Sequence, residues 1–315
     1  MSQKTVENAE VLSTETSNAS SNTMSLSGLR GTPVYDALAK GLRTHSLVIS
    51  PIPYLGGGGS GTLVKYKDKV GMLTATHVLI HYLDSREIFS PFQATDDPTF
   101  FINDHIQIKK IIYLDTESGL WQLDKADSYP ENTLDICLIE LDVDVFENVL
   151  QRSGKKAVDL SVYKENYTNN FDLYSSSNKD WCWAMDGAPR ENVKQDDNNI
   201  LQSRYDGLHV AGGRYRSTPL VHVLPSFDQT ADLCVHQLGP TLDPLPNRFA
   251  GMSGAGVWQV KFEGNKGKPS AIHELFFSGV VVSEGISSEE VSEELASRGP
   301  TSLYDIFLSY IDSIS

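Results

Sequence analysis

Short runs of hydrophobic residues, separated by polar turns, dominate the chain from Leu47 onward. The segments 62–66 and 70–74 are rich in β-branched and large apolar residues, and a Lys-Asp-Lys turn lies between them, which predicts a β-hairpin. Runs of the same kind predict further strands at 106–108, 112–114, 136–141, 220–224, 233–236, 256–262 and 276–282. The chain is therefore expected to be built mainly of β-strands.

Three segments have helical spacing instead. Residues 33–42 repeat apolar positions at helical intervals, with Thr32 as a candidate N-cap and a proline at the first helical position. Residues 143–150 show a second helical pattern. Residues 301–314 show a third, for which Ser302 is the expected N-cap. We expect one helix before the strands, one between two groups of strands and one at the C-terminus.

Polar segments are expected to lie outside the packed core. Residues 1–30 are rich in Ser, Thr and Asn and low in aromatic residues, which predicts a disordered tail. Residues 186–204 are dense in Asp and Asn and are expected to form a long surface loop. An acidic run at 289–294 is expected to be a linker to the C-terminal helix.

Three polar residues stand where a nucleophile, its base and an orienting carboxylate would be needed. His77 follows a predicted strand, Asp135 opens another, and Ser253 lies in a glycine-rich turn. A serine hydroxyl is a weak nucleophile until a base takes its proton, and a carboxylate that fixes the histidine tautomer completes such a group. Each residue alone has a plain structural explanation, but the order His, Asp, Ser is one of the known arrangements of a catalytic triad.

These segments resemble the motifs of the trypsin-like (chymotrypsin-fold) serine peptidases. The family's Leu-Thr-Ala-Ala-His is similar to LTATH at 73–77, its Asn-Asp-Ile-Ala-Leu-Leu to LDICLI at 134–139, and its Gly-Asp-Ser-Gly-Gly-Pro to GMSGAG at 251–256. The run GVVVSEG at 279–285 is similar to the strand that lines the family's substrate cleft. The stretch between residues 145 and 245 has no recognisable counterpart in the family.

The resemblance implies an all-β fold of two six-stranded antiparallel β-barrels, followed by a C-terminal α-helix. The first barrel would carry His77 and Asp135, and the second would carry Ser253. The implied divisions of the chain are a tail at 1–30, a first barrel at 31–145, a second barrel at 146–285, and an acidic linker with a helix at 286–315.

The resemblance also implies roles for further residues. The N–H groups of Gly251 and Ser253 would form the oxyanion hole, the pair of donors that stabilises negative charge on the substrate oxygen. Ser283 and Gly285 would flank the pocket and pair with substrate backbone as an added strand does. The expected substrate-binding positions are Asn247, Arg248, Ser283 and Gly285. No acidic residue stands at the expected base of the pocket, so a preference for Arg or Lys substrates is not predicted.

Met252 departs from the family pattern. Activatable members have an aspartate there, which pairs with the new N-terminus after cleavage. A methionine cannot form that ion pair. We therefore expect activity that is either constitutive or induced by an activating partner protein.

The composition argues against several classes of protein, namely nucleic-acid-binding, disulfide-rich and membrane-spanning proteins. The net charge of −15 argues against general binding to nucleic acid or to anionic membranes. The three cysteines are too few for a disulfide framework, and Cys137 is expected to pack in the core. With no apolar run long enough for a signal peptide or a membrane span, a soluble cytoplasmic protein is the simplest interpretation. No cofactor or metal is expected.

The leading prediction is a serine endopeptidase that hydrolyses peptide bonds of specific protein targets through a covalent acyl-enzyme. Its expected partner is a protein or peptide substrate. Two alternatives stay open. One is a binding or scaffold module that keeps the fold without efficient catalysis, and the other is an esterase or other acyl hydrolase, which the same chemistry permits.

Overall fold

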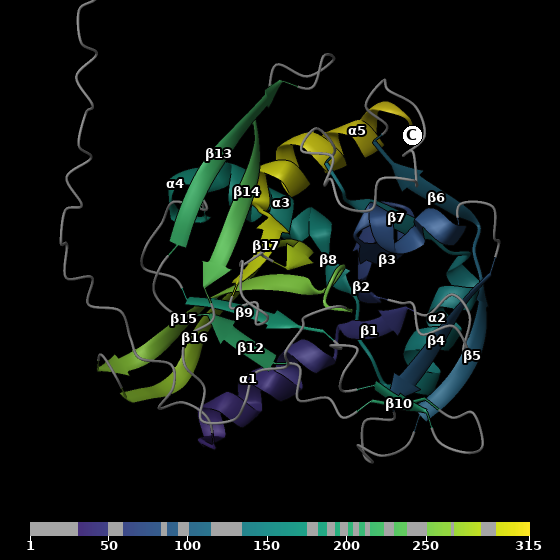
Figure 1. Cartoon of the computed structure of the whole chain (residues 1–315), viewed down its shortest axis with the longest axis horizontal. Helices are drawn as coiled ribbons and strands as arrows, with labels where there is room; N and C mark the ends of the chain where they lie inside the picture. The colour runs from purple at the N-terminus through teal and green to yellow at the C-terminus, as the bar shows by residue number, and fades with distance from the viewer. Residues whose placement is uncertain are drawn as a thin grey trace, which may run out of the picture.

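Two antiparallel β-sheets lie side by side and make up most of the molecule (Figure 1). The structure is a computed structural model. It describes residues 31–49, 59–82, 87–93, 101–114, 134–174, 182–187, 193–195, 201–203, 208–211, 215–223, 230–237, 251–265, 268–284 and 294–315. The tail predicted at 1–30 lies outside the described residues.

The first sheet contains the predicted hairpin. Strands β2 (Gly59–Tyr66) and β3 (Lys69–Thr74) pair antiparallel around a turn at Lys67, whose φ of 54° is left-handed. The sheet runs in the order β1-β2-β3-β7-β6, and β8 adds to β2 in parallel. The other strands are β1 (Ser46–Ile49), β6 (Lys110–Tyr113), β7 (Cys137–Glu140) and β8 (Val158–Asp159). A separate pair is formed by β4 (Glu87–Gln93) and β5 (Phe101–Gln107).

The second sheet has seven strands in the order β12-β9-β15-β16-β17-β14-β13. Its longest pair is β15 (Gly256–Asn265) with β16 (Lys268–Glu284). The other members are β9 (Cys182–Asp186), β12 (Leu208–Ala211), β13 (Tyr215–Val223), β14 (Thr230–Gln237) and β17 (Glu294–Arg298). Strands β10 (Val193–Gln195) and β11 (Leu201–Ser203) form a small pair of their own.

The predicted fold class is confirmed: the protein is mostly β, with two antiparallel sheets and a C-terminal helix. Among the described strands, the first sheet has six, the number predicted, and the second has seven. No pairing between these described strands joins the first and last strands of either sheet.

The first two predicted helices are confirmed. Helix α1 (Pro33–Arg43) begins where expected, because the Thr32 hydroxyl accepts a hydrogen bond from the Tyr35 N–H at 3.3 Å. Helix α2 (Val143–Ser153) ends at a left-handed Gly154. Helices α3 (Leu160–Asn169) and α4 (Phe171–Tyr174) were not predicted. No helix within the described ranges has the length and apolar character needed to cross a bilayer.

The C-terminal helix is present, but its predicted cap was wrong. The chain turns through η4 (Thr301–Phe307), which is π-helical, and continues as α5 (Leu308–Ser313). The Asp232 carboxylate of β14 accepts hydrogen bonds from the N–H groups of Thr301 and Ser302, at 3.3 and 2.8 Å. Ser302 instead donates its hydroxyl proton to the Asp232 carbonyl. The orphan N–H groups at this helix start are therefore satisfied from another element.

Two segments predicted as loops contain strands. Asp186 ends β9 and is fully buried, rather than opening a surface loop, and residues 193–195 and 201–203 pair with each other. Residues 294–298, expected to belong to a linker, form β17 between β16 and β14.

The main core lies between the two sheets and beneath the C-terminal helix. It joins Val64 and Leu73 of the first sheet to Trp258 and Phe277 of the second. Leu38 and Leu42 of α1 belong to the same core, and α1 contacts β9 and β16 although it precedes the first sheet in the chain. Six residues of the C-terminal helix complete it: Leu303, Tyr304, Ile306, Phe307, Leu308 and Ile311.

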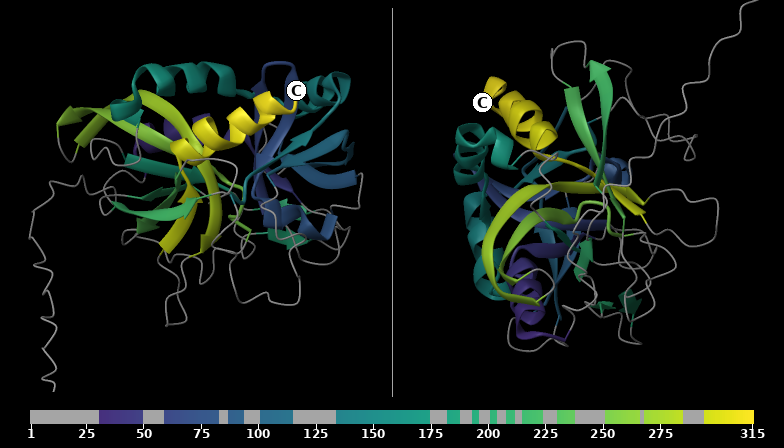
Figure 2. Two further views of the ribbon diagram at one scale, coloured as in Figure 1. Left: turned by 90° about the horizontal axis from the view of Figure 1, so that it is seen from above. Right: turned by 90° about the vertical axis from the view of Figure 1, so that its left-hand side faces the viewer.

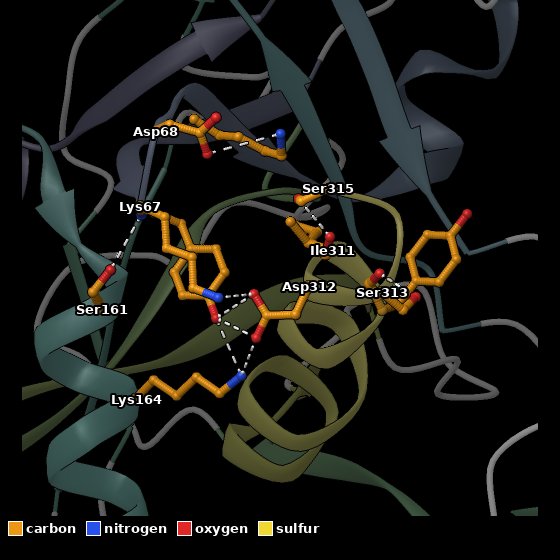
Figure 3. Close-up of polar contacts among 11 residues, drawn as sticks. Lys67, Asp68, Ser161, Lys164, Ile311, Asp312, Ser313 and Ser315 are labelled. Carbon is orange, nitrogen blue, oxygen red and sulfur yellow. Dashed lines mark hydrogen bonds and ion pairs between the residues drawn. The ribbon is translucent and has the colours of Figure 1, made fainter.

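The C-terminal helix links the two sheets. It begins against β14 of the second sheet and runs across the molecule to the β2–β3 turn of the first (Figure 2). There the Asp312 carboxylate accepts hydrogen bonds from Tyr66 Oη at 2.9 Å, from Lys67 Nζ at 2.6 Å and from Lys164 Nζ at 3.1 Å (Figure 3). Partial burial acts to raise the pKa of Asp312, but these three donors outweigh it and lower that pKa.

We predict that Asp312→Asn lowers the free energy of unfolding by about 1 kcal/mol, because this half-exposed network loses its only negative member. The contribution of Asp312 is fully present above its ordinary pKa of 3.8 and is lost as the pH falls through the lowered folded value. Urea unfolding at pH 7 and at pH 3 measures both effects.

Asp68→Asn is the matched control, since Asp68 is 81% exposed and lies 4.0 Å from Lys69 (Figure 3). Equal stability of both variants and the wild type at pH 7 would contradict a stabilising link at Asp312.

Candidate active site

The pairing of β3 with β7 brings His77 and Asp135 together. Thr74, the last residue of β3, lies opposite Cys137, the first residue of β7. Because the strands are antiparallel, the residues that follow β3 and those that precede β7 leave the sheet at the same end (Figure 1). His77 lies in the 3₁₀ turn η2 (Thr76–Tyr82) immediately after β3.

Asp135 binds His77 through both carboxylate oxygens. One oxygen accepts a hydrogen bond from the His77 backbone N–H at 3.0 Å, and the other lies 2.8 Å from Nδ1 of the ring. Asp135 is buried and has a φ of 52°, a left-handed conformation that is uncommon outside glycine and more accessible to aspartate than to most residues. The ionised carboxylate can only accept, so Nδ1 carries the proton and Nε2 of the neutral ring remains an acceptor.

The same contact sets the basicity of the ring. Burial alone would lower the pKa of His77, but the charge of Asp135 and its hydrogen bond to Nδ1 outweigh burial and raise that pKa above 6.5. The His77 side chain remains partly exposed, at 27% of its surface. The ring is therefore oriented, accessible and a stronger base than an ordinary histidine.

Ser253 lies in a tight turn just before β15. Gly251 and Gly254 have φ angles of 95° and 87°, which glycine adopts without steric cost. The N–H of Gly254 binds the Val281 carbonyl at 2.7 Å, and that of Ala255 binds the Met252 carbonyl at 2.8 Å. Among the described contacts, the N–H groups of Gly251 and Ser253, the two expected oxyanion donors, donate no hydrogen bond to another part of the chain.

Strand β2 holds this turn against the first sheet. The Ser60 N–H donates to the Ser253 carbonyl at 2.7 Å, and the Ser60 hydroxyl donates to the Gly251 carbonyl at 2.7 Å. The hydroxyl of Thr74 in turn donates to the Ser60 carbonyl at 2.7 Å. The Ser253 turn is thus tied through one residue to the end of the strand that precedes His77. These supporting roles of Ser60 and Thr74 were not predicted, because each depends on a contact between distant segments.

The surroundings of Gly59 show how closely the His77 turn and the Ser253 turn approach each other. A Cβ atom at Gly59 would lie 2.6 Å from Cγ2 of Val78, the neighbour of His77, and 2.8 Å from the carbonyl oxygen of Ser253. Only a residue without a side chain fits there. Among the described contacts, none joins the Ser253 hydroxyl to the His77 ring.

The surroundings of Met252 explain why a methionine, and not an aspartate, stands at this position. Its side chain is fully buried in a small apolar cluster of the second sheet with Met185, Ala255, Val257 and Val281. The remaining members of the cluster are Trp183 and Leu295. An aspartate in this cluster would be a buried charge with apolar neighbours, which is strongly unfavourable. The turn is therefore anchored by apolar packing at this position.

The predicted substrate-binding positions are only partly described. Asn247, Arg248 and Gly285 lie outside the described residues. The backbone of Ser283 belongs to β16, where it pairs with Ala296 of β17 next to a register shift. Cys137, predicted to pack in the core, is fully buried, and all three cysteines are free.

No protein-family model matches the sequence, and no curated protein matches it. Similar solved structures include Rv3671c from M. tuberculosis H37Rv in an inactive mutant form, with 12% identity, a TM-score of 0.43 and coverage of 91% of this chain and 93% of that one. The thermostable serine protease AL20 from an extremophilic microorganism has 11% identity, a TM-score of 0.41 and coverage of 88% and 100%. The Drosophila Grass clip serine protease of the Toll pathway has 13% identity, a TM-score of 0.44 and coverage of 86% and 70%.

Proposed function

We propose that this protein is a serine endopeptidase in which Ser253 is the nucleophile, His77 the general base and Asp135 the residue that orients His77. The observation that carries the proposal is the double hydrogen bond of Asp135 to His77, at the ring Nδ1 and at the backbone N–H. This contact leaves Nε2 as an acceptor on a partly exposed ring with a raised pKa. A histidine held only for packing does not need a buried carboxylate of this geometry.

In the proposed reaction, His77 Nε2 takes the Ser253 proton while the serine oxygen attacks a substrate carbonyl carbon. Negative charge then develops on the carbonyl oxygen, where the N–H groups of Gly251 and Ser253 serve as donors. The imidazolium gives its proton to the leaving amine, and an acyl-enzyme remains. Water, deprotonated by the same ring, hydrolyses that ester and restores the serine.

The absence of a hydrogen bond between Ser253 and His77 among the described contacts is compatible with this proposal. In enzymes without bound substrate, catalytic hydrogen bonds are often long and tighten only in the substrate complex. The Ser60 contacts hold the serine turn against the strand that pairs with β3, after which His77 follows.

Further parts of the proposal concern substrate and setting. We place the substrate-binding positions at Asn247, Arg248, Ser283 and Gly285, and we propose limited proteolysis of specific protein targets in the cytoplasm. With Met252 in an apolar cluster, activation does not use an ion pair at that position and requires either no trigger or an activating partner protein.

A fluorophosphonate probe, which acylates activated serines, tests the proposal. We predict labelling of the wild type and its loss in Ser253→Ala and in His77→Ala, because the first lacks the nucleophile and the second lacks its base. Gel fluorescence and intact mass measure the adduct.

Ser313→Ala and His273→Ala are the matched controls, because both residues lie on the exposed surface away from the site. Labelling that persists in Ser253→Ala would disprove the assignment of the nucleophile. A labelled protein that cleaves small esters but no peptide in a diverse library would favour an acyl hydrolase, and an unlabelled wild type would favour a binding module.

The pH dependence tests Asp135 separately. His77 acts as a base only when neutral, so the labelling rate should fall as the pH drops through its raised pKa, above the ordinary 6.5. In Asp135→Asn we predict a rate about 10⁴-fold lower, because the ring loses its correct tautomer. The acidic midpoint should also move to lower pH, since the interaction that raises the pKa is gone.

Stopped-time labelling between pH 4 and pH 9 measures both quantities. Glu263→Gln, which removes the carboxylate beside the exposed His273, is the control and should leave the profile unchanged. An Asp135→Asn variant with the wild-type rate and midpoint would contradict the orienting role.

A further inference from the structure

A charged group outside the proposed triad lies buried beneath the Ser253 turn. Asp186, the last residue of β9, has no exposed surface. It lies opposite Gly256 of β15, three residues after the proposed nucleophile. An isolated carboxylate in such a place is strongly unfavourable unless other groups compensate its charge.

Three residues from outside the second sheet provide that compensation. The Ser46 hydroxyl of β1 donates a hydrogen bond to Asp186. Burial raises the pKa of Asp186 and outweighs this hydrogen bond and the positive charges of Arg43 and Lys155, which act to lower that pKa. Arg43 ends α1, and Lys155 follows α2. The carboxylate of the second sheet is therefore held by groups that belong to, or immediately flank, the first.

Lys155 is itself almost completely buried, with 9% of its surface exposed. Its Nζ donates a hydrogen bond to the Arg43 carbonyl, the C-terminal end of α1, at 2.8 Å. Burial lowers the pKa of Lys155 to about 8, although the charge of Asp186 acts in the opposite direction. The ammonium group is thus fixed at one point by its hydrogen bond, and it is subject to the charge of Asp186.

Gly187 connects this buried group to the Ser253 turn. A Cβ atom at Gly187 would lie 2.7 Å from Cβ of Ala255, 2.8 Å from the Ser60 hydroxyl and 2.9 Å from the sulfur of Met252. The residue after Asp186 therefore packs directly on both sides of the turn and on the serine that binds the Gly251 carbonyl. Because Gly187 follows Asp186 directly, a displacement of Asp186 would also displace Gly187 and disturb its packing against the Ser253 turn.

We propose that Asp186 and Lys155 are positioning residues, which fix the Ser253 turn through Gly187 and make its geometry depend on the docking of α1. Ser46 completes this buried charge group. The catalytic consequence rests on the proposed peptidase function, whereas the structural consequence for the turn does not.

Energetics favour a positioning role over a stabilising one. Buried opposite charges add little net stability, because the cost of removing them from water offsets their attraction. Their geometry is nevertheless specific, because a misplaced charge is left uncompensated. A catalytic turn benefits from such specificity, since a displacement of about 1 Å at a reacting group can cost ~10²-fold in rate.

The test compares Asp186→Asn, Lys155→Met and Lys155→Arg with the wild type. We expect the rate of fluorophosphonate labelling to fall about 10²-fold in the first two, as for the loss of one oxyanion donor. Lys155→Arg, which retains the charge, should lose less of the labelling rate than Lys155→Met. Asp312→Asn is the matched control: it removes a carboxylate that binds Lys67 and Lys164, and it should lower stability without changing the labelling rate.

Hydrogen exchange of the peptide covering residues 251–257 provides a readout independent of activity. In Asp186→Asn the amides of Gly254 and Ala255 should exchange faster, while those of β2 and β3 stay protected. If Asp186→Asn does not fold, Ser46→Ala removes only the hydroxyl donor, and a smaller increase in the same amides is expected.

The outcomes separate the two proposals. Wild-type labelling and exchange in Asp186→Asn would overturn the positioning role. Lowered stability without faster exchange at residues 251–257 would overturn it as well, because Asp186 would then serve the fold alone. An unlabelled wild type, combined with faster exchange of the turn in Asp186→Asn, would reject the peptidase function and still support the positioning role.

Discussion

The hydrogen bonds from Ser60 to the Ser253 turn are the contact on which the arrangement of the site depends. The Ser60 N–H binds the Ser253 carbonyl, and its hydroxyl binds the Gly251 carbonyl. Because Ser60 belongs to β2, the same strand that pairs with β3, it fixes the second sheet relative to the turn that carries His77. The pairing of β3 with β7 then sets Asp135. The segments that carry His77, Asp135 and Ser253 are far apart in the chain. The strand register of the first sheet and the two hydrogen bonds of Ser60 bring them to one place.

Both apolar packing and a buried carboxylate surround the Ser253 turn next to this contact. Met252 anchors one side of the Ser253 turn in an apolar cluster, where no charge could be tolerated. On the other side, Gly187 brings the turn against the buried carboxylate of Asp186. A turn held only by apolar contacts could slide, whereas charges in a low-dielectric interior lose their compensation when they move. The turn is therefore packed in place without an ion pair at Met252 itself.

The two terminal helices hold the sheets together by crossing between them. Helix α1 precedes the first sheet in sequence but packs on β9 and β16 of the second. The C-terminal helix begins on the second sheet, at Asp232, and ends on the first, at Tyr66 and Lys67. Their apolar residues belong to one core that also includes both sheets. The interface that carries the site is therefore part of the fold itself.

Local patterns were sufficient for the hairpin, for α1 with its Thr32 cap and for α2, because each depends on residues close together in the chain. His77, Asp135 and Ser253 became candidates through their order along the chain and the resemblance of their motifs to those of a known family. The cap of the C-terminal helix could not be predicted, since Asp232 supplies it from 70 residues away. Asp186 was assigned to a surface loop for the same reason: its polar neighbours in sequence indicate exposure, and only the strand register buries it against residues of other elements. Sequence determined which groups are available for chemistry, and tertiary contacts decided which of them are buried, paired and held in place.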